Sequence, residues 1–273
     1  MVFKDKLLSA ARNNKSWLCV GLDPDLNKLP DSVAKNTDGI LKFLKAIIDS
    51  TKDLVCAYKP NSAFFEQFGA EGIILLKNII DYIPDEIPVI LDAKRGDIGN
   101  TSKMYARAAF DYLGADAITV NPYMGLDCVK PFLDYQDKGV FVLCLTSNPS
   151  SEEFQKQYLK DRGMLYQQVA QTALTWNKHG NLCFVVGATS PEELGEVRKL
   201  IGDDPAILIP GVGAQGGDLE QSLRNGANNR GELAIINVSR SVLYAPTKAD
   251  YTDKSRSEAL MLVSAMRKIL TLN

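Results

Sequence analysis

Residues 88–97 of the chain read PVILDAKRGD, an apolar run that passes directly into a cluster of charged side chains. A short apolar run rich in β-branched residues predicts a buried strand. Its apolar residues follow one another without polar ones between them, as in strands of parallel sheets that are covered on both faces. We therefore predict a parallel strand that ends where the charged residues begin.

Similar apolar runs lie before and after this segment, and helical patterns separate them. The eight predicted strands are Trp17–Leu22, Leu54–Tyr58, Pro88–Asp92, Ala117–Asn121, Val140–Thr146, Leu182–Gly187, Ala206–Pro210 and Leu233–Val238. Between them, apolar residues such as Ile40, Leu44 and Ile47 recur at the spacing of one helix face. The predicted helices include Gly39–Thr51, Gly72–Ile83, Thr101–Leu113, Glu153–Asn177, Pro191–Ile201 and Lys254–Leu270, and another begins near Leu219.

Eight strands that alternate with helices favour an α/β fold, a single (β/α)₈ TIM barrel of one domain over residues 1–273. The alternative is an open doubly wound sheet, which usually carries a glycine-rich fingerprint after its first strand. Here the first strand ends in GLDPD at residues 21–25 instead. A longer excursion at about 148–181, between the fifth and sixth strands, is expected to cover the mouth of the barrel or to serve an interface.

The composition excludes several classes of function. The 273 residues include 31 Lys and Arg against 33 Asp and Glu, so the net charge of -2 gives no basic footprint for nucleic acid. The only histidine, His179, rules out an HExxH zinc site, and its place near the end of a predicted helix indicates an exposed residue rather than a catalytic one. Any chemistry must therefore depend on carboxylates, lysines, arginines and backbone amides.

The cysteines and the apolar segments bear on the compartment. Cys19, Cys56, Cys128, Cys144 and Cys183 are odd in number and show no CxxC spacing, which predicts reduced core thiols. Residues 1–15 lack the uninterrupted apolar run of a signal peptide, so none is expected, and no 18 apolar residues follow one another to span a bilayer. We expect a cytoplasmic protein without a membrane partner.

Polar residues follow most of the predicted strands directly. They are Asp23, Lys59, Asp92, Lys94, Asn121, Ser147, the segment 211–217 and the pair Ser239-Arg240. In a barrel these strand ends meet at the C-terminal mouth, where active sites of this architecture lie. Unpaired charge is costly in such a confined space, so we expect the charges there to form an organised group.

The densest group is the DxKxxD pattern formed by Asp92, Lys94 and Asp97. Side chains of a strand alternate between its faces, so Asp92 and Lys94 are expected on the same face. An isolated DxK is more often a simple ion pair beside a turn, but Lys59 ends the neighbouring strand. The resulting Lys–Asp–Lys–Asp array would keep the carboxylates ionised and raise the lysine pKa values.

Residues 210–218 read PGVGAQGGD and precede the helix that begins near Leu219. Glycines let backbone N–H groups approach an anion, and a helix N-terminus favours negative charge. Arg240, after the eighth strand, adds a guanidinium suited to a bidentate clamp. The simpler interpretation is a flexible turn with a surface arginine, yet loops after strands seven and eight often bind phosphate in TIM barrels. We favour phosphate recognition.

Taken together, these motifs resemble those of the orotidine 5′-phosphate decarboxylase family, in its second sequence subfamily. The matching strings are GLDP (21–24), YKPN (58–61), LDAKRGDIGNT (91–101), NPYMG (121–125), TSNP (146–149), PGVGAQGG (210–217) and SRS (239–241). DxKxxD alone is a weak signal because related sugar-phosphate enzymes share it. The ordered set, from the first strand to the eighth, is highly specific.

The resemblance implies a lyase of pyrimidine biosynthesis that releases CO₂ from orotidine 5′-monophosphate to give uridine 5′-monophosphate. It implies no metal and no organic cofactor. Lys59, Asp92, Lys94 and Asp97 would form the catalytic array, with Lys94 protonating C6 of the pyrimidine.

The resemblance also implies the remaining contacts with the substrate. Asp23 would bind the ribose, Ser147 the pyrimidine, and Gln215 with Arg240 the phosphate, while the substrate-binding set further includes Thr101, Pro210 and Gly217. Asp97 and Thr101 would reach into the site of a neighbouring subunit across a homodimer interface.

Two other functions stay open at this point. One is a Mg²⁺-dependent sugar-phosphate decarboxylase or aldolase of the same suprafamily, although Lys59 and Lys94 would compete with a hydrated cation for the carboxylates. The other is a non-catalytic barrel that binds a nucleotide phosphate, although such a module does not need Lys94 beside Asp92.

Overall fold

The computed structural model describes residues 1–213, 216–245 and 250–271, and in it eight parallel strands form the barrel. These strands are β1 (Leu18–Gly21), β2 (Ala57–Lys59), β3 (Ile90–Arg95), β4 (Ala117–Val120), β5 (Gly139–Leu145), β8 (Leu182–Val186), β9 (Ile207–Pro210) and β10 (Ala234–Val238). They are paired in the order β2-β1-β10-β9-β8-β5-β4-β3. Parallel bridges between Tyr58 and Val89 and between Asn61 and Asp92 connect β2 to β3. The predicted TIM barrel is confirmed, and each predicted strand contains at least half of an observed one.

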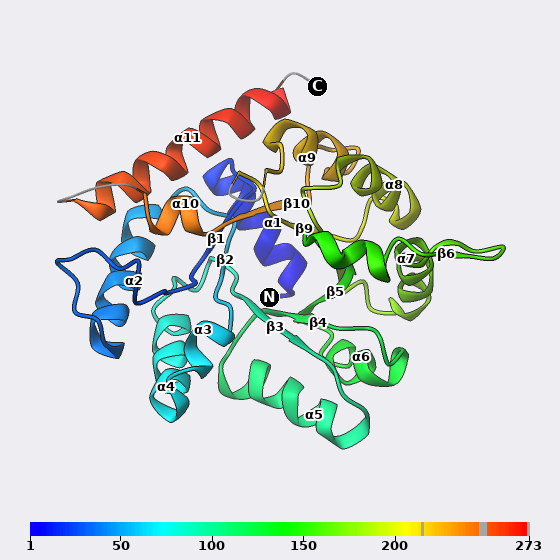
Figure 1. Cartoon of the computed structure of the whole chain (residues 1–273), viewed down its shortest axis with the longest axis horizontal. Coiled ribbons are helices and arrows are strands. Elements are labelled where there is room, and N and C mark those ends of the chain that lie inside the picture. Colours follow the sequence, from blue (N-terminus) through cyan, green and yellow to red (C-terminus); the bar gives the residue numbers. More distant parts are fainter. Residues whose placement is uncertain (214–215, 246–249, 272–273) are drawn as a thin grey trace.

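Helices surround the strands (Figure 1). They are α1 (Phe3–Asn14), α2 (Thr37–Thr51), α3 (Ala63–Glu66), α4 (Gly69–Ile80), α5 (Gly99–Arg107), α6 (Leu126–Leu133), α7 (Leu165–Trp176), α8 (Pro191–Ile201), α9 (Leu219–Gly226), α10 (Arg240–Leu243) and α11 (Tyr251–Thr271). The prediction for α8 matches both of its ends, and the helix predicted to begin near Leu219 is α9. The predicted helix Thr101–Leu113 is α5 followed by a π-helical turn, Ala108–Tyr112.

The first half of the predicted helix Glu153–Asn177 is wrong. A 3₁₀ turn, Pro149–Glu153, is followed by a small hairpin of β6 (Tyr158–Leu159) and β7 (Gly163–Met164). Asp161 and Gly163 adopt the left-handed conformation, with φ of 62° and 74°, which reverses the chain and delays the helix until Leu165. The hairpin extends away from the barrel (Figure 1).

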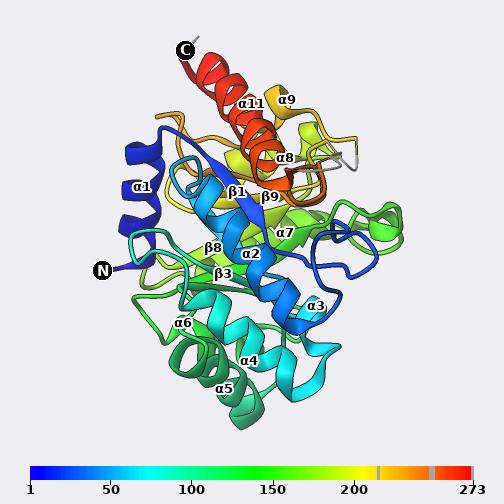
Figure 2. The same ribbon diagram turned by 90° about the vertical axis from the view of Figure 1, so that its left-hand side faces the viewer.

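Helix α1, which the sequence patterns did not indicate, covers the end of the barrel where the strands begin. Phe3 packs edge-on against Phe141 of β5, with ring centroids 5.7 Å apart. Lys6 Nζ lies 2.9 Å from a carboxylate oxygen of Asp116, just before β4. Arg12 Nη2 lies 2.8 Å from a carboxylate oxygen of Glu232, just before β10. Figure 2 shows α1 at one side of the molecule and the loops after β1 and β5 at the other. The barrel is thus closed at one end.

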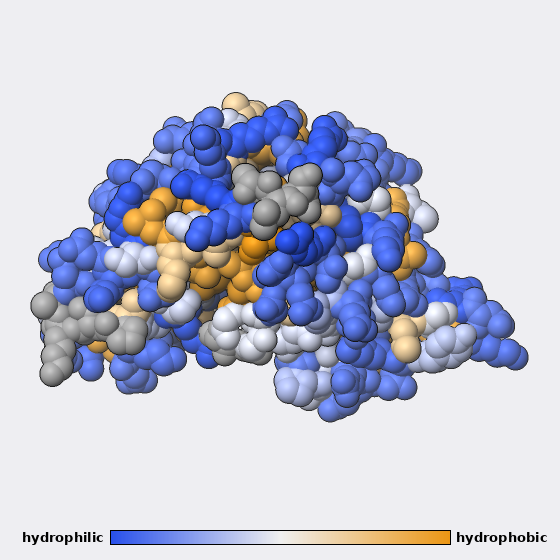
Figure 3. Space-filling model, turned by 90° about the horizontal axis from the view of Figure 1, so that it is seen from above, coloured by the Kyte–Doolittle hydropathy of each residue, from blue (hydrophilic) through white to orange (hydrophobic). Residues whose placement is uncertain are grey.

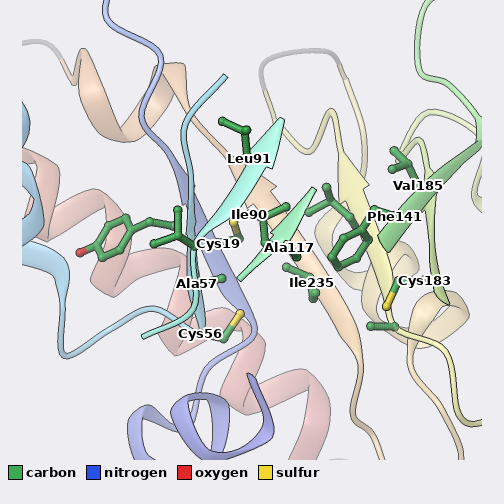
Figure 4. Close-up of a cluster of buried hydrophobic side chains, with 14 of the residues drawn as sticks. Cys19, Cys56, Ala57, Ile90, Leu91, Ala117, Phe141, Cys183, Val185 and Ile235 are labelled. Atoms are coloured by element: carbon green, nitrogen blue, oxygen red, sulfur yellow. The ribbon is translucent and has the colours of Figure 1, made fainter. Parts of the chain in front are cut away.

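The barrel core is filled by apolar side chains, which form one continuous cluster with the faces of the surrounding helices (Figure 4). All five cysteines are buried and none forms a disulfide, as predicted. Burial raises the pKa of the Cys19 thiol to about 12. A single continuous cluster supports the expectation of one domain over 1–273, which stays a prediction.

The outer surface is mostly hydrophilic. On the face seen in Figure 3, where α11 lies, apolar side chains also gather in one area, and Leu260 and Met261 of α11 are exposed. His179 is exposed after the end of α7, as predicted. In the described part of the chain, no helix is both long and apolar enough to cross a membrane.

Candidate active site

A cavity of about 600 Å³ lies at the carboxyl ends of the strands. Seven of the residues predicted for the site line it, namely Asp23, Lys59, Asp92, Lys94, Ser147, Pro210 and Arg240. These residues come from the ends of six strands or from the segments that follow them. The convergence expected at the mouth of a TIM barrel is therefore observed.

Asp92 is the centre of the site and touches two ammonium groups. Lys59 Nζ lies 2.9 Å from Asp92 Oδ2, and Lys94 Nζ lies 2.7 Å from Asp92 Oδ1. The Asn61 amide lies 3.4 Å from Oδ2, and the Thr119 hydroxyl donates to Oδ1 at 2.9 Å. Both carboxylate oxygens therefore have at least two partners, which fixes the orientation of the group.

The two buried members of this group control each other's charge. Burial alone would raise the pKa of Asp92, but Lys59 and Lys94 outweigh it and hold the pKa well below its usual value. Burial would likewise lower the pKa of Lys59, yet the nearby Asp92 and Asp23 carboxylates raise it above the usual value. Asp92 is thus an anion and Lys59 a cation at neutral pH. The side chain of Lys94 is 47% exposed, so the cavity can reach its ammonium group.

Lys94 reaches the cavity through an irregular piece of strand. The register between β3 and β4 shifts between Leu91 and Arg95, and Lys94 has a left-handed backbone with φ of 48°. Such a conformation is unfavourable for a residue with a Cβ. The predicted common face of Asp92 and Lys94 is confirmed, but the bulge and not the regular alternation of a strand brings it about.

Asp23 is held by two other loops at the mouth. Its Oδ1 accepts a hydrogen bond from the backbone N–H of Asn61 at 3.2 Å. The Tyr244 hydroxyl donates to the Asp23 carbonyl at 3.0 Å and accepts from the Asp25 N–H at 2.6 Å. These bonds connect the segments that follow β1, β2 and β10, so they fix the place of the Asp23 carboxylate at the cavity.

The described parts of the glycine-rich segment, residues 211–213 and 216–217, lie close together beside the cavity. Val212 and Gly217 form a parallel bridge, and a Cβ on Gly217 would lie 2.5 Å from that of Ala188. Gly217 is thus required for packing and does not itself line the cavity, unlike Pro210 and Arg240. Gln215 lies outside the described residues. Asp218 caps α9 by accepting from the Gln221 N–H at 2.7 Å.

Asp97 and Thr101 do not line the cavity of their own chain. Asp97 precedes α5, where its carboxylate accepts from the Ile98 N–H at 2.7 Å, and Thr101 is exposed on α5. The structure of one chain therefore brings together three members of the predicted array and leaves the fourth at the rim.

Several cavity residues were not among the predicted site residues. Thr119, Asn61 and Tyr244 are described above, and Asn237 of β10 also lines the cavity. The buried Asn237 Oδ1 and Ser239 Oγ atoms have no hydrogen-bond partner in the structure. A polar residue within an otherwise apolar strand is the signal that would have indicated Thr119 and Asn237, since a buried polar group needs a partner.

In the described ranges, no group of three or more His, Cys, Asp and Glu side chains is arranged to hold a metal ion. Both oxygens of Asp92, the most buried carboxylate of the cavity, contact ammonium groups. A divalent cation at Asp92 would have to displace these groups, since it requires several oxygen ligands.

Comparisons with known proteins agree over nearly the whole chain. The model of the orotidine 5′-phosphate decarboxylase / HUMPS family matches residues 16–253. The chain is 48% identical over 271 residues to the orotidine 5′-phosphate decarboxylase of Roseiflexus sp. (strain RS-1), covering 99% of both. It is 49% identical over 259 residues to that of Herpetosiphon aurantiacus, covering 94% of this chain and 95% of the relative.

Two solved structures from Leishmania donovani have the same fold. The OMP decarboxylase matches with a TM-score of 0.86 and 42% identity, covering 98% of this chain and 99% of that one. The UMP synthase matches with a TM-score of 0.87 and 44% identity, covering 98% of this chain but 57% of that one. The similarity therefore includes every strand of the barrel.

Proposed function

The chain belongs to the orotidine 5′-phosphate decarboxylase / HUMPS family, and on this premise we propose that it converts orotidine 5′-monophosphate to uridine 5′-monophosphate and CO₂. The observation that carries the proposal is the buried Asp92 carboxylate between two ammonium groups at the cavity. This arrangement supplies a fixed anion and a cationic proton donor within one small space.

Lys94 is the proton donor in the proposed mechanism. When the bond between C6 and the carboxylate breaks, its electron pair stays on C6 in the plane of the ring, where the π system cannot delocalise it. A positioned cation stabilises this charge most directly. Lys94 Nζ then transfers a proton to C6 and regains one from solvent, which its partial exposure permits.

Asp92 and Lys59 prepare the site for this step. Asp92 stays ionised, so it repels the substrate carboxylate in the ground state, and this repulsion disappears as neutral CO₂ leaves. Lys59, 3% exposed, neutralises Asp92 from the buried side. Asp92 also holds the Lys94 ammonium at 2.7 Å, so the proton donor is already oriented before substrate binds.

The rest of the cavity suits a nucleotide. Arg240 and the glycine-rich segment 211–217 would bind the phosphate together with Gln215, Asp23 would bind the ribose, and Ser147 the pyrimidine. The phosphate site is remote from C6, so its binding energy can order the mouth for the reaction.

A metal-dependent reaction on a sugar phosphate is the second candidate, and the ammonium groups on Asp92 argue against it. The decisive experiment is to add orotidine 5′-monophosphate with excess EDTA and follow the fall in ultraviolet absorbance. We expect full turnover. Loss of turnover that Mg²⁺ restores would support the metal-dependent reaction, and phosphate-dependent binding without turnover would indicate a non-catalytic barrel.

We further propose a homodimer in which Asp97 and Thr101 complete the site of the partner. Asp97 and Thr101 lie before and within α5, which contacts α6, and apolar side chains just before these two helices are unusually exposed, Ile98 at 59% and Tyr123 at 88%. Such a patch is costly in water, and a second copy of the chain would cover it.

Subunit mixing tests this arrangement. Asp97→Ala and Lys94→Ala chains should each be inactive, but after exchange a hybrid dimer contains one intact site. Random exchange makes half of the dimers hybrid, so about a quarter of the wild-type activity should return. No recovery after exchange has been verified would mean that each site is built within one chain.

We also propose that the enzyme works in the cytoplasm. Five free, buried cysteines fit a reducing compartment, where thiols do not form disulfides. Fractionation of cells that express a tagged chain would test this, and recovery from the secreted fraction would contradict it.

A further inference from the structure

The hydroxyl group of Thr119 on β4 contacts both the anion and the backbone of the proton donor. Its Oγ1 lies 2.9 Å from Asp92 Oδ1 and 3.0 Å from the backbone nitrogen of Lys94. Thr119 is 1% exposed, and the same Asp92 oxygen also accepts from Lys94 Nζ at 2.7 Å. A closed ring of hydrogen bonds therefore connects Thr119, Asp92 and both ends of Lys94.

The chemistry of the three groups fixes the direction of each bond. A backbone N–H can only donate and an ionised carboxylate can only accept. The Thr119 hydroxyl must therefore accept from Lys94 and donate its single proton to Asp92. Serine could make both bonds, valine neither, and a thiol only weak versions of them.

The bulge in β3 explains why Lys94 depends on this hydroxyl. Leu91 pairs with Ile118 and Arg95 with Val120, so Asp92, Ala93 and Lys94 together lie opposite Thr119 alone. The Lys94 N–H donates to a side chain of β4 here. Lys94 is also left-handed, a conformation that persists only where the surroundings impose it.

We propose that Thr119 is a positioning residue for the decarboxylation, which holds Lys94 in its left-handed conformation and orients Asp92 through one hydroxyl group. The inference rests on the proposed function, because it concerns the placement of the proton donor. Thr119 acts through Asp92 and Lys94, so its loss should affect the chemical step and not substrate binding.

Thr119→Val and Thr119→Ser provide the test. Valine matches threonine in shape but removes both bonds, and a small misplacement of the donor should lower kcat about 10- to 100-fold. The KM and the Kd for uridine 5′-monophosphate should stay within about threefold of wild type. Serine restores the hydroxyl and should bring kcat back to within about threefold of wild type.

Thr51→Val is the matched control. Thr51 is also fully buried and bonded, to Tyr58 and to the Ile47 carbonyl, but it lies in α2 and does not line the cavity. We expect its kcat to be unchanged even if its Tm falls. An unchanged kcat in Thr119→Val, an equal loss in Thr119→Ser, or a change confined to KM would each overturn the role of Thr119.

Two further measurements keep the outcome decisive. If Thr119→Val does not fold, Thr119→Cys should give a kcat between those of the serine variant and an inactive enzyme, and a wild-type kcat would overturn the proposal. Amide hydrogen exchange at Lys94 should be at least about tenfold faster in Thr119→Val. An unchanged rate of amide exchange at Lys94 would overturn the contact between Thr119 and the Lys94 backbone. This measurement does not depend on whether the wild type decarboxylates orotidine 5′-monophosphate, so failure of the Thr119 proposal can be told apart from failure of the proposed function.

Discussion

The two ends of the barrel both contain a buried charge, but they satisfy it differently. At the mouth, Asp92 is paired with two ammonium groups beside a cavity. At the end that α1 covers, Arg198 is 7% exposed and donates only to backbone carbonyls, those of Gly202, Pro205, Gly226 and Leu233. Burial lowers the pKa of Arg198 to about 10, so it remains a cation at neutral pH.

This difference indicates that Arg198 stabilises the fold, whereas the charged group around Asp92 is arranged for chemistry. Arg198 ties together the segments that lead into β9 and β10, and every partner belongs to the main chain. The charges at the mouth contact other side chains, and Lys94 keeps an exposed ammonium and an unfavourable backbone conformation. Changes at the mouth should therefore affect turnover, whereas changes at the closed end should affect folding.

The largest effect is expected for Lys94→Ala. Loss of the proton donor should lower kcat by about 10³-fold or more, while the Kd for uridine 5′-monophosphate stays within about threefold. Lys178→Ala, at an exposed position near the closed end, is the control and should match wild type. Substantial decarboxylation by Lys94→Ala in the absorbance assay would remove the donor role of Lys94.

Arg198→Met should give the next largest effect, on stability. It leaves several buried carbonyls without a donor and should lower the free energy of unfolding by about 3 kcal/mol or more. Urea unfolding would measure the loss of unfolding free energy. The kcat of the folded variant should stay within about twofold of wild type. Arg12→Met, which removes a surface pair at the same end, should cost about 1 kcal/mol or less. Equal costs would contradict a structural role particular to Arg198.

Arg240→Ala tests the part of the mouth that is remote from the charged group. Loss of a charge-assisted contact should raise the Kd for uridine 5′-monophosphate about 10- to 100-fold. The phosphate-free nucleoside uridine should bind nearly as before. Calorimetry with both ligands would check this, and equal losses for the two would argue against a phosphate contact.

The smallest effect concerns the pH dependence of stability. Because the folded pKa of Asp92 is lowered, its contribution is complete above the unfolded value of about 3.9 and is lost as the pH falls toward the folded pKa. The folded pKa of Lys59 is raised instead. Its contribution to stability is therefore complete below the unfolded pKa of about 10.4 and is lost as the pH rises through the folded pKa. The difference in unfolding free energy between wild type and Asp92→Asn should stay constant from about pH 5 to about pH 7 and shrink below about pH 4. A difference that grows on acidification would contradict the lowered pKa.

The barrel could be predicted because its strands are continuous apolar runs. The segments that escaped prediction depend on contacts between distant residues. Helix α1 has a mixed sequence, and its helical state is supported by packing such as that of Phe3 on Phe141. The hairpin within 153–177 depends on the backbone of Asp161, whose left-handed conformation no periodicity reveals.

The residues of the site likewise include some that could be predicted from the sequence and some that could not. Charged residues directly after strands, such as Asp92 and Lys59, could be assigned to the cavity because every strand end meets there. Thr119 lies within its strand, and only the register shift of β3 shows that it is opposite residues 92–94. The role proposed for Asp97 involves a second chain, so it cannot be read from one chain alone.

The burial of all five cysteines has a practical consequence for measuring subunit exchange. Burial raises the pKa values of Cys19, Cys144 and Cys183 to about 12, so almost no thiolate is present at neutral pH. A cysteine introduced at an exposed position, such as Ser264 of α11, would react with a fluorescent maleimide far faster than the native thiols. Donor- and acceptor-labelled chains could therefore be prepared without first replacing the native cysteines.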